Sequence, residues 1–124
     1  MKIKPSNSTI ELLVISLITI AGTFIFAYVS YVIITDSYPD SVISIWNTWD
    51  TQHYLRIAES GYTTRIIYER HLHIVFFPLF PLLTKVFSFV FQNYLLSGLI
   101  VSNISYMIAV FYLYKLVLLD HEKE

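Results

Sequence analysis

The side chains that could carry out acid–base chemistry are concentrated in one segment of this chain, residues 36–73. This segment holds five of the nine carboxylates, three of the four histidines and both tryptophans. Asp50 and His53 are three residues apart, so on a helix their side chains would be neighbours. An ionised aspartate held against a hydroxyl group can act as a general base. The structural alternative is an acid that caps a helix and complements its dipole.

Aromatic residues lie close to this pair. Trp46 lies four residues before Asp50 and Trp49 lies four residues before His53, about one helical turn in each case. Their flat rings are suited to stacking on the C–H face of a sugar ring. The same residues are equally typical of anchors at a membrane–water interface.

A basic cluster follows in the same segment. Arg70 could pair with a phosphate through its guanidinium group, with His71 beside it. The alternative is an ordinary polar boundary before an apolar stretch. His53, His71 and His73 do not match the spacing of the usual metal sites, so we predict no metal and no cofactor.

A short helix is predicted to position Asp50 and His53. The sequence indicates a helix over residues 48–60, which Gly61 ends because a positive φ is favoured there. Tyr54, Ile57 and Ala58 recur with Gly61 at spacings of three and four, which gives the helix one apolar face. This helix would either lie on a membrane surface or pack against neighbouring helices.

The composition indicates the surroundings of this segment. Of the 124 residues, 56% are hydrophobic and 14% are charged, whereas soluble domains carry about 25% charged residues. The net charge of −1 excludes a disordered chain and a strongly basic nucleic-acid binder. The absence of cysteine excludes a disulfide scaffold and a thiol nucleophile. We therefore predict an all-α, polytopic integral membrane protein, with residues 1–124 forming a single membrane module.

Three transmembrane helices are expected, because about 20 apolar residues cross a bilayer core. The predicted spans are residues 12–35, 74–91 and 94–119. Lys2 and Lys4 favour a cytoplasmic N-terminus, which makes residues 36–73 an extracytoplasmic loop. The second span is interrupted by two prolines, so its segment 76–81 is predicted to line a cavity that faces the helix of Asp50.

Two blocks of the sequence resemble a known family. The string Trp49-Asp50-x-x-His53-Tyr54-Leu55-x-Ile57-Ala58-x-x-Gly61-Tyr62 is similar to a block of the GPI mannosyltransferase II (PIG-V-like) family, in the glycosyltransferase C superfamily. Tyr68-Glu69 and Phe76-Phe77-Pro78-Leu79-Phe80-Pro81 resemble further elements of that family, in the same order. The resemblance covers about residues 40–119, the N-terminal portion of such an enzyme.

The resemblance implies a glycosyltransferase that moves mannose from a polyprenyl (dolichyl) phosphate donor to a hydroxyl of a glycolipid or glycan, as in GPI-anchor biosynthesis. Asp50 would be the general base and His53 would flank it. The candidate substrate-binding residues are Trp46, Trp49, Tyr54, Glu69, Arg70, His71, Phe77 and Pro78. The roles of Arg70 and His71 rest on their charge alone and not on a family motif.

Family members are several times longer, so we expect this chain to be incomplete by itself or to assemble with a second chain that supplies further helices. The alternative function is a non-catalytic truncated or accessory membrane protein that binds a polyprenyl lipid. A related transferase that uses another sugar is a third possibility. The expected location is the plasma membrane in a prokaryote, which the short loops favour slightly, or the endoplasmic reticulum membrane in a eukaryote.

Overall fold

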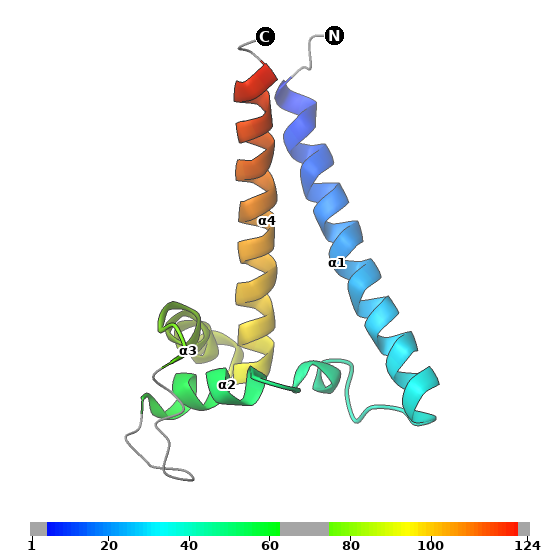
Figure 1. The fold of residues 1–124 in the computed structure, drawn as a ribbon, viewed down its shortest axis with the longest axis vertical. Coiled ribbons are helices and arrows are strands. Elements are labelled where there is room, and N and C mark those ends of the chain that lie inside the picture. The colour runs from blue at the N-terminus through cyan, green and yellow to red at the C-terminus, as the bar shows by residue number, and fades with distance from the viewer. Residues whose placement is uncertain (1–4, 63–74, 122–124) are drawn as a thin grey trace. The chain divides into compact units, whose positions relative to one another are not determined.

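The computed structural model describes residues 5–62 and 75–121 of the chain (Figure 1). Helices take up 81% of these residues, and no strand is present among them. The all-α class predicted from the sequence is therefore confirmed. The described helices are α1 (Pro5–Thr35), the short 3-10 helix η1 (Ser44–Trp46), α2 (Thr51–Ser60), α3 (Leu79–Phe91) and α4 (Tyr94–His121).

Two of these helices are long and apolar enough to cross a membrane. The apolar stretches are Thr9–Thr35 of α1 and Tyr94–Leu119 of α4, close to the predicted spans. Most of their large apolar side chains are exposed, among them Ile18, Phe26 and Leu116. A core helix of a soluble protein would bury such side chains. The exposed apolar surface of both helices thus indicates association with a membrane.

A third span is not confirmed. The sequence predicts one over residues 74–91, but α3 covers only Leu79–Phe91, 13 residues. At 1.5 Å per residue such a helix is about 20 Å long, shorter than the roughly 30 Å hydrocarbon core. The helix begins directly after Pro78, and Pro81 lies in its first turn, where a proline is tolerated because the N–H groups there have no partner within the helix.

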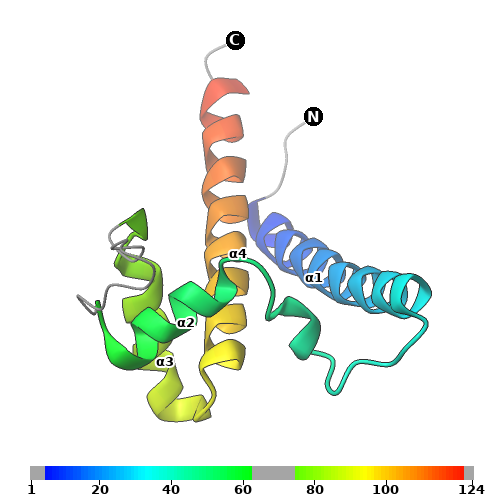
Figure 2. The same cartoon turned by 60° about the horizontal axis from the view of Figure 1, so that its bottom comes forward.

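The chain divides into two compact units. One comprises residues 1–37 and 103–124, and the other comprises residues 38–102. In the second unit α2 packs against α3 and the first turns of α4, as both views show (Figures 1 and 2). The apolar face predicted for α2 makes this contact, since Ile57 and Ala58 are only 4% and 1% exposed.

The connection between α3 and α4 is as tight as the sequence predicts. Gln92 adopts a left-handed conformation with φ of 50°, which ends α3. The side-chain oxygen of Asn93 then accepts a hydrogen bond of 2.9 Å from the backbone N–H of Leu96, which caps the start of α4. Two residues therefore suffice to reverse the chain.

Small residues allow α4 to lie close to both other helices. Gly98 of α4 is surrounded by Leu55 of α2 and by Phe80 and Thr84 of α3. A Cβ atom built on Gly98 would lie 3.5 Å from the ring of Phe80 and 3.8 Å from Leu55 and Thr84. Ser97 beside it is fully buried. This contact holds α2, α3 and the start of α4 together.

Candidate functional site

Asp50 occupies the residue directly before α2, but it does not cap the helix with its side chain. Its backbone carbonyl accepts hydrogen bonds from the N–H groups of His53 (3.0 Å) and Tyr54 (3.2 Å). Its own conformation is already helical, with φ of −72° and ψ of −10°, whereas a capping residue is usually extended. The carboxylate therefore makes no capping hydrogen bond and remains exposed. Asp50 therefore occupies the position of a helix-capping acid but does not make the side-chain hydrogen bond of one.

Trp49 has a strained backbone. Its φ is 54°, a region that a bulky residue rarely adopts, and its side chain is 94% exposed. Such a conformation costs about 1–3 kcal/mol, and residues strained in this way cluster at active sites and ligand-binding segments. Trp49 directly precedes Asp50 in the sequence. The indole ring and the carboxylate are both exposed, so a ligand can reach either group.

Trp46 differs from Trp49. It ends the short helix η1 and is half-buried, with its indole nitrogen inside the protein. From the sequence, the two tryptophans are equally good candidates for stacking on a sugar ring. Of the two, only Trp49 presents an exposed ring.

His53 is held by an aromatic side chain from the other sequence block. Its ring stacks on Phe76, with 5.4 Å between ring centroids and an angle of 25° between the planes. One residue further along α2, the ring of Tyr54 meets the edges of Phe76 (4.8 Å) and Phe80 (5.2 Å). Together these contacts join the first turn of α2 to the start of α3.

Tyr62 adds a polar link between the same two segments. Its hydroxyl group donates a hydrogen bond of 2.5 Å to the backbone carbonyl oxygen of Phe76. This carbonyl lies just before α3. Tyr62 lies just beyond Gly61, whose φ of 77° ends α2 as the sequence predicts. The hydrogen bond between Tyr62 and Phe76 therefore joins the end of α2 to the start of α3.

The segment 76–81 was predicted to line a cavity that faces the helix of Asp50. In the structure it packs directly on α2, and the side chains that make the contact are not the two named as binding residues. Phe77 is 81% exposed, and Pro78 is also exposed. The side chains that contact α2 are Phe76, which lies before α3, and Phe80, which lies in its first turn.

Three of the predicted binding residues, Glu69, Arg70 and His71, lie outside the described residues, and His73 does too. Among the residues that the structure describes, no group of three or more potential ligands could hold a metal ion. The described part of the site is thus an exposed carboxylate, a stacked imidazole and an exposed indole at the start of α2.

These groups can remove a proton from a hydroxyl group and bind the flat apolar face of a sugar ring. Asp50 is able to accept a proton from an incoming hydroxyl group, and Trp49 offers a surface on which a sugar ring could stack. Comparison of the chain with protein-family models, with curated proteins and with solved structures finds no match.

Proposed function

We propose that this chain is the N-terminal module of an integral-membrane mannosyltransferase that resembles the GPI mannosyltransferase II family. Its donor is mannose carried on a polyprenyl phosphate, and its acceptor is a hydroxyl group of a glycolipid or glycan. No separate metal or cofactor takes part. The enzyme lies in the plasma membrane of a prokaryote or in the endoplasmic reticulum membrane of a eukaryote.

The observation that carries this proposal is the contact between the two sequence blocks on which the resemblance rests. His53 and Tyr54 belong to the first block, and Phe76 and Phe80 belong to the second. Their rings pack together. Two blocks that build one site in an enzyme must meet in the fold, and these two do.

The reaction follows from the groups at the start of α2. Asp50 takes the proton from the acceptor hydroxyl while the hydroxyl oxygen attacks the anomeric carbon of mannose. The bond from that carbon to the phosphate oxygen breaks, and the lipid phosphate leaves with the electron pair. Attack opposite the leaving group inverts the anomeric centre. Trp49 stacks on the mannose ring, and the charges of Arg70 and His71 stabilise the departing phosphate.

The membrane segments place this chemistry at one surface of the bilayer. We propose that α1 and α4 span the membrane and that α3, with Pro78 before it and Pro81 in its first turn, lies within the membrane as a third, shorter helix. Lys85 of α3 is half-buried and not surrounded by lipid on all sides, which reduces the penalty for a charge at that depth. Further helices, from the same or a partner chain, enclose the two lipid substrates.

An accessory protein that binds a polyprenyl lipid without turnover is the second candidate. The exposure of Asp50 and Trp49 favours it, because a complete transferase site would shield both groups from water. The two candidates share the donor lipid and differ in whether the chain takes part in its reaction.

The test uses membranes from cells that contain the chain and from cells that lack it. Radiolabelled polyprenyl phosphomannose and nucleotide-linked mannose are supplied separately, and mannose transfer to glycolipid is measured. We expect transfer from the lipid-linked donor only, and only where the chain is present. Equal transfer in both membranes, with the donor still bound by the chain, would favour the accessory protein.

A further inference from the structure

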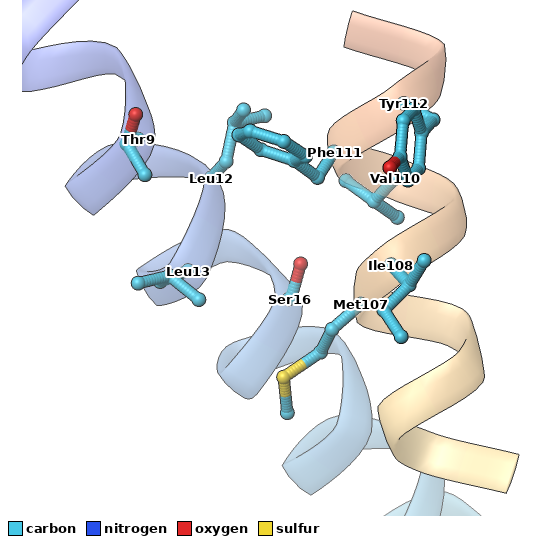
Figure 3. A pocket seen from close by; sticks show the side chains of 9 residues that line it. All are labelled: Thr9, Leu12, Leu13, Ser16, Met107, Ile108, Val110, Phe111 and Tyr112. Carbon is cyan, nitrogen blue, oxygen red and sulfur yellow. The ribbon is translucent and has the colours of Figure 1, made fainter.

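A groove runs between α1 and the second half of α4, within the unit formed by residues 1–37 and 103–124 (Figure 3). Its volume is about 420 Å³, within the range of small-molecule sites. The residues that line it are Thr9, Leu12, Leu13 and Ser16 of α1, and Met107, Ile108, Val110, Phe111 and Tyr112 of α4.

The wall of the groove is mostly apolar, with hydroxyl groups from Thr9, Ser16 and Tyr112. Leu12 faces the ring of Phe111 across it, and Ser16 faces Met107 further along (Figure 3). Ser16 is only 2% exposed, so its small side chain lies in the contact between the helices and leaves space that a larger residue would fill. Because both helices are apolar on their outer faces, hydrocarbon is the material that surrounds the groove.

One end of the groove carries a positive charge. Lys115 follows Phe111 by one helical turn, and its Nζ atom lies 4.7 Å from the centre of that ring. The side chain of Lys115 is itself exposed. With 100° of rotation per residue, Glu11 points away from the side of α1 that carries Thr9 and Ser16. The carboxylate of Glu11 therefore does not neutralise Lys115 from within the groove.

We propose that this groove binds a phospholipid with a net negative headgroup. One acyl chain lies between α1 and α4, against Leu12, Ser16 and Met107, and the headgroup phosphate rests on the ammonium group of Lys115. A lysine close to the membrane surface attracts anionic lipids by about 1 kcal/mol, which corresponds to a preference of about fivefold. This site is separate from the proposed transfer reaction and needs none of its residues.

Other apolar occupants fit the charge less well. A third helix or a second copy of the chain lying in the groove would cover Phe111 and press apolar side chains against the ammonium of Lys115. Removing an ammonium group from water is unfavourable. A phosphate group offers Lys115 a negative charge and stays at the membrane surface.

The test reconstitutes the whole chain in phosphatidylcholine bilayers that contain a small fraction of lipid spin-labelled near the end of one acyl chain. Electron paramagnetic resonance measures the motionally restricted fraction for labelled phosphatidylglycerol and for labelled phosphatidylcholine. We expect the protein to prefer phosphatidylglycerol about fivefold. Lys115→Gln should reduce this preference to about onefold, and Lys115→Arg should retain it.

Two further variants separate the groove from the rest of the helix surface. Ser16→Leu fills the groove and should lower the restricted fraction of phosphatidylglycerol, whereas Thr23→Leu, on an exposed part of α1, should not. An unchanged preference in Lys115→Gln would overturn the proposal. Because the chain has no cysteine, Met107→Cys gives a single thiol. Efficient disulfide cross-linking of two copies through it would assign the groove to a dimer contact and would also overturn the proposal. So would displacement of labelled phosphatidylglycerol by equimolar polyprenyl phosphate.

Discussion

Gly98 offers the sharpest test of how α2 and α3 pack on α4. A Cβ atom at this position would lie 3.5–3.8 Å from Phe80, Leu55 and Thr84, which is ordinary van der Waals contact. Gly98→Ala should therefore be accommodated, and it should gain up to about 1 kcal/mol from the better helix propensity of alanine. Gly98→Leu has nearly the same propensity, but its outer carbon atoms meet side chains already in contact. Overpacking of this kind costs about 1–3 kcal/mol.

The measurement is thermal unfolding of the full chain in a mild detergent, with the alanine and leucine variants compared directly. Gly22 of α1 provides the matched control, because no atom lies within 4 Å of a Cβ built there. We expect Gly98→Leu to unfold at a temperature several degrees below that of Gly98→Ala, since about 1 kcal/mol shifts the midpoint of a domain this size by roughly 2–8 °C. The corresponding pair at Gly22 should differ little. Equal midpoints for the two variants of Gly98 would refute the packing described for this unit.

Three further stability measurements use the same assay. Trp49→Gly should be more stable than Trp49→Ala by about 1 kcal/mol, because only glycine relieves the positive φ. Asp50→Ala should change the free energy of unfolding by less than about 0.5 kcal/mol, since no capping bond is lost, while Asn93→Ala should lose about 1 kcal/mol with its cap on α4. Tyr62→Phe should lose about 0.5–1.5 kcal/mol with the hydrogen bond to the carbonyl before α3.

Each of these has an outcome that contradicts it. Equal stability of the two variants of Trp49 would mean that its backbone is not strained. A loss as large for Asp50→Ala as for Asn93→Ala would mean that the aspartate caps α2 after all. An unchanged midpoint in Tyr62→Phe would remove the link between the end of α2 and the start of α3.

Local sequence signals predicted where α2 ends, because Gly61 accepts the positive φ at which the helix stops. They placed the start of this helix at residue 48 instead of Thr51, and they did not identify Asn93 as the cap of α4. The length of apolar sequence predicted α1 and α4 for a similarly local reason. The sequence also predicted that the segment 76–81 faces the helix of Asp50, since two prolines in an apolar run must be accommodated by neighbouring structure. It predicted a cavity between them, whereas aromatic rings of the two segments are in direct contact.

The features that the sequence did not predict depend on contacts between distant residues. Nothing local distinguishes Phe76 from Phe77, yet the first packs on α2 and the second is exposed. The strained φ of Trp49 is set by how the turn enters α2, and propensity alone would not place a tryptophan there. The groove beside Ser16 arises only because a small residue of α1 faces α4, about ninety positions later in the chain.

The role of Asp50 as the general base is the central claim, and one paired measurement tests it most directly. Wild-type chain, Asp50→Asn and the control Glu59→Gln are expressed in cells that lack the chain, and both transfer of mannose from polyprenyl phosphomannose and binding of that donor are measured. Loss of a general base lowers the rate by about 10²–10⁴-fold. We predict a loss in this range for Asp50→Asn with donor binding retained, and wild-type transfer for Glu59→Gln. Wild-type transfer by Asp50→Asn would contradict the account.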